Sequence, residues 1–209
     1  MRYDILLAGV GGQGVLSMAA IIGRAALAEG LTAKQSEVHG MAQRGGAVQA
    51  HLRLSDGAIE SDLISLGRAD LILSLEPVES LRYLSWLSPG GTLVTASDPF
   101  VNIPNYPDLG VVLAKIRSLP HAIVVDAERI ALEAGDVQAL NTVMVGAVMH
   151  LLPIRPEAIE KAVKDTFGRK GEFVLNTNLA ALRAGREAAR TGGGAASAAA
   201  GPAARGAST

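Results

Sequence analysis

The sequence predicts an α/β fold, with a Rossmann-like, mostly parallel sheet covered by helices on both faces and a helical C-terminal part. Three observations predict it. Short apolar runs typical of buried parallel strands recur up to residue 126. A glycine-rich loop joins the first of these runs to a helical pattern, and helical patterns alone follow residue 126. Alternation of strands with helices indicates parallel strands as neighbours in the sheet.

The N-terminal part begins with an expected strand over residues 3–8, which are apolar after the first two positions. A glycine-rich loop follows at residues 9–14. Apolar residues then recur at helical spacing from residue 16 to a close at Gly30. A second strand is expected over residues 31–38, and residues 39–46, rich in glycine and polar groups, are expected to form a loop.

Residues 47–54 alternate between apolar and polar side chains, which is the period of a strand. The apolar set is Val48, Ala50 and Leu52, and the polar set is Gln49, His51 and Arg53. This pattern predicts a strand with one solvated face, on which His51 lies. A turn signal at residues 55–57 then suggests a return strand over residues 58–61.

The remaining elements follow from the same two periods. Another buried strand is expected over residues 71–75, a helix over 79–86, a turn over 88–91 and a strand over 92–96. Residues 97–110 have little periodicity and are expected to be a loop, and residues 123–126 a further strand. Helices are expected around 127–134, 139–152, 156–167 and 172–190.

Domain organisation follows from composition. Residues 1–190 are expected to form a single domain. Residues 191–209 contain no apolar side chain larger than alanine, so burial cannot offset the entropy of ordering them. We expect this Gly/Ala-rich tail to be disordered.

Charge and hydropathy exclude several classes of function. The formal net charge of −1 gives no basic footprint for nucleic acid. The longest strongly apolar stretch, residues 143–154, is too short for a membrane span, which needs roughly 20 apolar residues. No signal peptide is apparent before the first expected strand, so a cytoplasmic location is the expectation.

The chain contains no cysteine, which excludes disulfides, a cysteine nucleophile and any cysteine-ligated iron–sulfur cluster on this chain. Its four histidines show no pairing at metal-ligand spacing. We therefore expect no metal site. His39 and His51 could be catalytic in principle, but we assign no catalytic residue to this chain.

The glycine loop carries the strongest local signal. Gly9, Gly11 and Gly14 satisfy Gly-x-Gly-x-x-Gly directly after a strand and before a helix. Glycines in this context let the backbone approach a diphosphate, whose charge then lies on free N–H groups at a helix N-terminus. The alternative is that the glycines only form a tight strand-to-helix turn.

The loop alone does not decide which diphosphate compound binds. A nicotinamide dinucleotide needs an acidic residue after the second strand to hold its ribose, and Glu37 is the one candidate. Coenzyme A also carries a diphosphate, so both ligands remain open at this point.

Several separated motifs together resemble the gamma domain of 2-oxoacid:ferredoxin oxidoreductases, over about residues 3–186. The residue 39–46 version is similar to the small subunit of the indolepyruvate type, whereas pyruvate and 2-oxoglutarate relatives tend to show Tyr-Gly-x-Glu-x-Arg-Gly-Gly there. The motifs are Gly9-Val10-Gly11-Gly12-Gln13-Gly14-Val15, Ser36-Glu37-Val38-His39-Gly40-Met41-Ala42-Gln43-Arg44-Gly45-Gly46, His51-Leu52-Arg53, Asn141-Thr142, Lys170-Gly171 and Asn178-Leu179-Ala180-Ala181.

The resemblance implies a division of labour. A large partner subunit would hold thiamine diphosphate and the iron–sulfur clusters, decarboxylate the arylpyruvate and reduce ferredoxin. The acyl group would end on coenzyme A, which this chain would help to bind, and the chain would be inactive alone. Two alternatives remain: the gamma subunit of another 2-oxoacid enzyme, and a stand-alone nucleotide-binding regulatory protein.

The resemblance also implies a set of cofactor-binding residues, and several have a structural alternative. Arg44 could be a surface or interface arginine, Asn141 a helix cap, and Asn178 an interhelix contact. Asp126, which ends a strand, is expected to be a helix cap. By motif, the residues that would face the coenzyme A diphosphate are Gly11, Gly12, Gln13 and Gly14, with Gln43 or Arg44, Asn141 and Asn178 as further contacts.

Overall fold

The structure is a computed structural model that describes residues 1–39, 45–101 and 103–192. Its strands are β1 (Arg2–Val10), β2 (Thr32–His39), β3 (Ala47–Ser55), β4 (Ala69–Ser74), β5 (Leu87–Ala96) and β6 (Ala122–Val125). Its helices are α1 (Val15–Ala28), α2 (Pro77–Arg82), α3 (Leu109–Arg117), α4 (Ala127–Ala134), α5 (Leu140–Val148), α6 (Pro156–Phe167) and α7 (Glu172–Gly192), with short 3-10 helices η1 (Leu84–Trp86), η2 (Val137–Ala139) and η3 (Gly168–Lys170).

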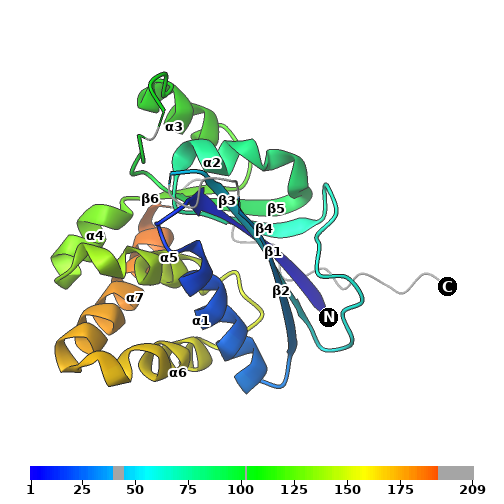
Figure 1. Ribbon diagram of the computed structural model, residues 1–209, viewed down its shortest axis with the longest axis vertical. Coiled ribbons are helices and arrows are strands. Elements are labelled where there is room, and N and C mark those ends of the chain that lie inside the picture. The colour runs from blue at the N-terminus through cyan, green and yellow to red at the C-terminus, as the bar shows by residue number, and fades with distance from the viewer. Residues whose placement is uncertain (40–44, 102, 193–209) are drawn as a thin grey trace.

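The described strands form one sheet in the order β2-β3-β1-β4-β5-β6 (Figure 1). Strands β1, β4, β5 and β6 are parallel, and β3 lies antiparallel between β1 and β2. The prediction of a mostly parallel, Rossmann-like sheet is therefore confirmed.

Helices cover both faces of this sheet, as predicted (Figure 1). Successive residues of β1 point to opposite faces, and each face has its own core. Ile5 and Leu7 pack with α1, α4, α5, α6 and α7, whereas Leu6 and Ala8 pack with α2 and α3. The full burial of all four side chains explains why residues 5–8 of β1 are apolar at every position instead of alternating.

The helical C-terminal part is built on the crossing of α5 and α7. A side chain at Gly146 would overlap the backbone of Leu182, and one at Gly185 would overlap the backbone of Val143. The two helices approach this closely because neither has a side chain at the crossing.

The prediction that one face of β3 is solvated is wrong. His51 and Arg53 are buried, with 3% and 6% of their surfaces exposed. The segment 56–68 covers them instead of forming the return strand expected at 58–61, where the structure has no strand. Arg53 holds this segment, since its Nη1 donates to the carbonyls of Ser61 (2.6 Å) and Leu63 (3.0 Å).

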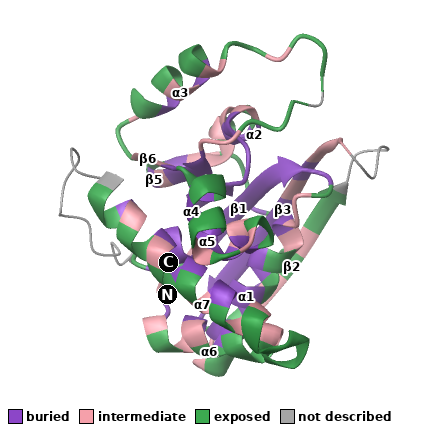
Figure 2. Cartoon of the chain, turned by 90° about the vertical axis from the view of Figure 1, so that its left-hand side faces the viewer, coloured by how far each residue is buried: buried purple, intermediate pink, exposed green. Residues whose placement is uncertain are grey.

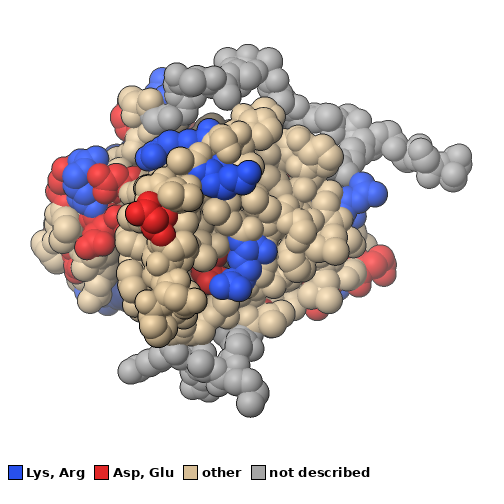
Figure 3. Space-filling view, turned by 90° about the horizontal axis from the view of Figure 1, so that it is seen from above, with Lys and Arg blue, Asp and Glu red and all other residues tan. Residues whose placement is uncertain are grey.

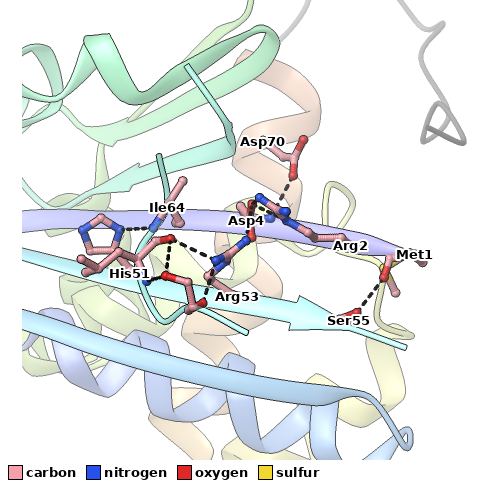
Figure 4. Close-up of polar contacts among 10 residues, drawn as sticks. Met1, Arg2, Asp4, His51, Arg53, Ser55, Ile64 and Asp70 are labelled. Atoms are coloured by element: carbon pink, nitrogen blue, oxygen red, sulfur yellow. Dashed lines mark hydrogen bonds and ion pairs between the residues drawn. The ribbon is translucent and has the colours of Figure 1, made fainter. Parts of the chain in front are cut away.

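An ion pair inside the sheet makes that burial possible (Figure 4). Arg53 Nε lies 2.9 Å from Asp4 Oδ1, and the two side chains are 7% and 2% exposed. Arg2 also donates to Asp4, at 2.6 and 2.8 Å. His51 accepts a hydrogen bond from the N–H of Ile64 at 3.0 Å. A polar row that resembles a solvated face is thus a buried, paired network.

Strand ends differ from the predictions by one or two residues, and the larger differences are these. Residues 88–91 belong to β5 and not to a turn, and α2 begins and ends earlier than the expected 79–86. Helix α3 was not predicted, and α5 ends at Val148 and not at residue 152. Of the expected disordered tail, residues 191–209, the first two belong to the end of α7, and residues 193–209 lie outside the described residues. Within the described chain, no helix is both long enough and apolar enough to cross a membrane.

Candidate functional site

The candidate site lies where the direction of winding changes. Helix α1, which follows β1, covers one face of the sheet, and α2, which follows the neighbouring strand β4, covers the other. The carboxyl ends of β1 and β4 therefore meet at a topological switch point, the place where open α/β sheets bind ligands. The glycine loop, residues 9–14, lies on the β1 side of this point, and its first two residues are the last two of β1.

Neighbouring backbone holds the glycine loop in shape. The N–H of Gly11 donates to the carbonyl of Gly46 at 2.8 Å, and the N–H of Gly45 donates to the carbonyl of Gly11 at 3.2 Å. These two bonds continue the β1–β3 ladder, in which Val10 pairs with Ala47. The amide of Gly11 is therefore committed to the fold.

The side chain of Gln13 is also committed to the fold. Its Oε1 accepts from the N–H of Val10 at 2.8 Å, and its Nε2 donates to the carbonyl of Leu75 at 3.3 Å. Leu75 directly follows β4, so this one amide connects the carboxyl ends of β1 and β4. The backbone N–H of Gln13 is used as well, since it donates to the carbonyl of Val10 at 3.0 Å. Gln13 therefore shapes the site and offers no free donor to a ligand.

The glycine loop has backbone N–H groups that are free to bind an anion. The N–H groups of Gly12, Gly14 and Val15 make no hydrogen bond to any residue that the structure describes. Gly12 and Gly14 have positive φ values of 105° and 81°. The first turn of α1 contains no acidic residue to compete for an anion. The donor set suits a phosphate group.

Space around the loop also suits a ligand. A Cβ added at Gly12 would meet no atom of the described residues within 4 Å, so this part of the loop faces open space. A Cβ added at Gly14 would lie 2.5 Å from Asn141 Nδ2. The loop is thus open on one side and packed against the start of α5 on the other.

Asn141, which the resemblance implied as a ligand contact, bonds to the glycine loop itself. Its Nδ2 donates to the carbonyl of Gly14 at 3.3 Å. The alternative of a helix cap is wrong, because the cap position of α5 is Ala139 and no side chain caps this helix. Asn141 instead joins α5 to the loop.

Asn178 lies in α7 and is buried, with 5% of its surface exposed. Its Oδ1 accepts from Thr142 Oγ1 at 2.6 Å, and its Nδ2 donates to the carbonyl of Val174 at 2.8 Å. Both ends of the amide are therefore used in joining α5 to α7. This is the interhelix contact that the sequence left open as the alternative to a ligand contact.

Gln43 and Arg44 lie outside the described residues. The residues on either side of residues 40–44 are described: the N–H of Gly45 donates to the carbonyl of Gly11, and His39 is the last residue of β2.

A group that the sequence analysis missed lies at the end of β4. Glu76 is 1% exposed, accepts from the N–H of Glu79 at 2.8 Å and accepts from the hydroxyl of Tyr106. Burial, and then the Glu76 carboxylate, raise the pKa of the Tyr106 phenol. Burial raises the pKa of Glu79, while Arg82 opposes the shift. An acidic residue between a buried strand and Pro77 was the available signal.

The position of Glu37 disfavours a nicotinamide dinucleotide. Glu37 pairs in register with Ala50, and Ala50 pairs with Leu7 of β1. Because β3 lies between β2 and β1, Glu37 is two strand spacings, about 10 Å, from the strand that precedes the glycine loop. In the dinucleotide fold the acidic residue follows the strand next to the first one.

Asp126 has a different role from the expected helix cap. It occupies the cap position of α4, but its side chain makes no cap hydrogen bond. Asp98 caps this helix instead, accepting from the N–H of Glu128 at 3.1 Å, while Asp126 pairs with Arg129 at 2.7 Å. In the described part of the chain, no group of His, Asp and Glu side chains is arranged to hold a metal ion.

Comparison with known sequences gives a family match over most of the chain. The profile for pyruvate ferredoxin/flavodoxin oxidoreductases matches residues 4–188. Indolepyruvate oxidoreductase subunit IorB of Archaeoglobus fulgidus is 39% identical over 202 residues, which are 92% of this chain and 98% of that protein. 2-Oxoglutarate synthase subunit KorC of Methanothermobacter thermautotrophicus is 34% identical over 190 residues, 90% of this chain and 95% of that one.

Solved structures share the fold. The gamma subunit of a keto/oxoacid ferredoxin oxidoreductase from Geobacter sulfurreducens is 28% identical, with a TM-score of 0.67 over 90% of this chain and 99% of that chain. 2-Oxoglutarate:ferredoxin oxidoreductase from Magnetococcus marinus, solved with 2-oxoglutarate, coenzyme A and succinyl-CoA bound, is 23% identical with a TM-score of 0.73. The match covers 91% of this chain but 31% of the longer Magnetococcus chain.

Proposed function

Because the chain belongs to the pyruvate ferredoxin/flavodoxin oxidoreductase family, we propose that it is the small subunit of an indolepyruvate (arylpyruvate):ferredoxin oxidoreductase. The observation that carries this proposal is the 39% identity to a protein named indolepyruvate oxidoreductase subunit IorB, over nearly the whole of both chains. The enzyme would catalyse the coenzyme A-dependent oxidative decarboxylation of aryl 2-oxoacids in the cytoplasm.

The reaction needs groups that this chain does not supply. Iron–sulfur clusters are held by cysteine thiolates, and the chain has no cysteine. We therefore assign the clusters and thiamine diphosphate to a large partner subunit, which also passes electrons to ferredoxin. The small subunit contributes to coenzyme A binding and is inactive by itself.

The glycine loop is the proposed coenzyme A site. The N–H groups of Gly12, Gly14 and Val15 would hold the diphosphate, assisted by the positive end of the α1 dipole. Gly11 and Gln13 would shape the loop, since Gly11 N–H bonds to Gly46 and the Gln13 amide bonds to Val10 and Leu75. Coenzyme A, when bound, supplies the thiol that accepts the acyl group.

The remaining site residues would either support the glycine loop or contact the ligand. Asn141 would fix the loop through its bond to Gly14, and Asn178 would support α5 through Thr142. Gln43 or Arg44 would add a contact from the segment between β2 and β3. An arginine there would give a charged, forked donor for phosphate.

The second candidate is a subunit of a 2-oxoglutarate enzyme, since a protein named 2-oxoglutarate synthase subunit KorC is 34% identical to this chain. The motif His39-Gly40-Met41-Ala42-Gln43-Arg44-Gly45-Gly46 favours the indolepyruvate assignment over this one. A stand-alone nucleotide-binding protein is the third candidate, and it would need no large partner.

One experiment separates the three candidates. The chain is purified together with the large thiamine-binding subunit from the same genome, and coenzyme A-dependent ferredoxin reduction is measured over a panel of aryl, branched and dicarboxylic 2-oxoacids. We expect the highest kcat/KM with indolepyruvate or another arylpyruvate. Preference for 2-oxoglutarate would select the second candidate. Failure of the two chains to form an active complex, or stoichiometric iron on the isolated small chain, would contradict the proposal.

A further inference from the structure

An apolar arm lies between β5 and α3. We use the name arm for residues 98–101 and 103–108. It presents Phe100, Val101 and Ile103, which are 41%, 68% and 40% exposed, and Val111 follows in α3 at 68%. Figure 2 shows the arm standing away from the body of the molecule, next to the exposed surface of α3.

Polar contacts hold the arm at both ends. At its start, Asp98 accepts from the N–H of Glu128 at 3.1 Å. Near its end, the hydroxyl of Tyr106 donates to the buried Glu76, and Asp108 accepts from the N–H of Val111 at 2.9 Å. The apolar side chains between these anchors are therefore held outward by the surrounding structure.

The arm also restricts its own backbone. Pro99, Pro104 and Pro107 each fix φ and remove one backbone donor. The connection that contains the arm, residues 97–108, is longer than most connections in compact domains, whose median length is about 4–6 residues. A restrained loop loses less entropy on binding than a flexible one.

The surface on the side of α3 carries few charged side chains over much of its area. Seen from this side, most of the coloured surface belongs to residues other than Lys, Arg, Asp and Glu (Figure 3). Large apolar side chains grouped on an exposed surface mark interaction sites. Phe100, Val101, Ile103 and Val111 fall within a short stretch of chain.

The arm lies at the same edge of the sheet as the glycine loop. It follows the carboxyl end of β5, and the bond between Tyr106 and Glu76 places it at the carboxyl end of β4. Strand β4 is the direct neighbour of β1, whose carboxyl end is the glycine loop. A partner that covers the arm therefore meets the edge that carries the proposed coenzyme A site.

We infer that the arm and the exposed surface of α3 are the docking surface for the large thiamine-bearing subunit. This inference rests on the proposed function: the acyl group forms on the partner and must reach a thiol held at this edge. The length of the Magnetococcus relative adds support. There the same fold is 31% of a longer chain, so further protein is covalently attached and available to cover such a surface.

The test is a charge placed in the arm. Val101→Glu adds a carboxylate at a 68% exposed position and removes no core contact. The matched control is Leu27→Glu, at a 60% exposed position near the end of α1. Leu27 lies toward the opposite edge, since the chain that follows it enters β2 at Thr32, which pairs through Ser55 with Arg2 at the start of β1.

The dissociation constant of each variant with the purified large subunit is measured by sedimentation, together with the thermal unfolding midpoint of the free chain. We expect Val101→Glu to weaken association at least tenfold with an unchanged midpoint, and Leu27→Glu to bind like the wild type. Amide hydrogen exchange of the wild-type arm, with and without the large subunit, gives a second measurement that needs no variant. We expect protection of the arm in the complex.

Three other outcomes would contradict either the docking surface or the proposed function. If the wild type binds the large subunit but Val101→Glu binds equally well and the arm gains no protection, the docking surface is wrong while the proposed function stands. If the wild type fails to bind the large subunit, the proposed function fails. If Val101→Glu abolishes self-association of the small chain and leaves partner binding intact, the surface serves a second copy and the inference is wrong.

Discussion

The side-chain amide of Asn141 donates a 3.3 Å hydrogen bond to the carbonyl of Gly14, across 127 positions of sequence. Gly14 ends the glycine loop and caps α1 in a left-handed conformation, with φ 81°. Asn141 belongs to the first turn of α5, a helix that packs on α1 and α7. The position of the loop backbone thus depends on the C-terminal helices as well as on β1 and α1.

Gly14→Ala tests this dependence. The new Cβ would lie 2.5 Å from Asn141 Nδ2, and the left-handed conformation alone costs a non-glycine residue about 1–2 kcal/mol. We expect a loss of roughly 2–3 kcal/mol in the free energy of unfolding, measured in urea. In the Gly14→Ala/Asn141→Ala double variant the contact is relieved and the backbone strain remains, so part of the loss should return. A double variant as unstable as the sum of the singles would contradict this account.

Gly12→Val tests the loop as a coenzyme A site. The new side chain would occupy the open space beside the free N–H groups of Gly12 and Gly14, so coenzyme A should bind at least tenfold more weakly to the assembled enzyme. Single-turnover cluster reduction without coenzyme A should be unchanged. The steady-state dependence of ferredoxin reduction on coenzyme A concentration measures the effect.

Gly30→Val is the matched control. Gly30 also has a positive φ, 80°, and no described atom within 4 Å of an added Cβ, but it lies beyond the far end of α1. It should lower stability by an amount similar to Gly12→Val and leave the coenzyme A dependence unchanged. If both variants alter that dependence equally, or Gly12→Val does not alter it, the loop is only a turn.

How much of this site could be predicted from the sequence depends on the range of the interactions. The glycine loop follows from local chemistry, because strand, glycines and helix are contiguous. Two hydrogen bonds could not be predicted: the one from Gln13 to Leu75 and the one between Thr142 and Asn178. Each joins elements that are distant in sequence, and periodicity does not show which elements pack together. The bond of Tyr106 to Glu76 was missed for the same reason.

The fold shows the same division. Buried strands such as β1 could be predicted from short apolar runs, because burial on both faces favours a continuous apolar run such as residues 5–8. Alternation in β3 was misread as solvation, because a polar row has the same period whether it faces water or buried partners. The deciding partner, Asp4, lies on another strand and pairs with Arg53 across the sheet. The pairing of β3 between β1 and β2 was likewise invisible to periodicity.

Arg53→Met tests the buried ion pair. Methionine keeps much of the volume but leaves Asp4 with only the exposed Arg2 as a partner, and it releases the carbonyls of Ser61 and Leu63. We expect a loss of about 3 kcal/mol in the free energy of unfolding, the lower end of values for breaking a buried pair.

Lys161→Met is the control for that variant. Lys161 pairs with Asp165 at 2.7 Å on the surface of α6, with side chains 67% and 45% exposed. Solvent screens such pairs, so its removal should cost less than about 1 kcal/mol. Equal losses for Arg53→Met and Lys161→Met in urea unfolding would show that burial adds nothing to the Asp4–Arg53 pair.

The last prediction concerns His51 and pH. Burial lowers the pKa of this imidazole, and the neighbouring Arg53 lowers it further, with Asp4 opposing. The folded pKa is thus below the unfolded value of about 6.5. As the pH falls through about 6.5, the unfolded chain binds a proton that the folded chain does not, so the folded state loses stability until the pH reaches the folded pKa. The limiting slope for one such proton is about 1.4 kcal/mol per pH unit.

His51→Asn should flatten this dependence, because asparagine can still accept a hydrogen bond from the N–H of Ile64 and does not titrate. Burial also lowers the pKa of His150, so part of the slope should remain in the variant. Urea unfolding at pH 7.5 and pH 5.5 measures the difference, with His121→Asn as the control at an exposed position. We expect His51→Asn to reduce the loss of unfolding free energy between the two pH values and His121→Asn to leave it unchanged. An equal loss in the wild type and His51→Asn would mean that the imidazole takes up its proton in the folded protein as readily as in the unfolded chain.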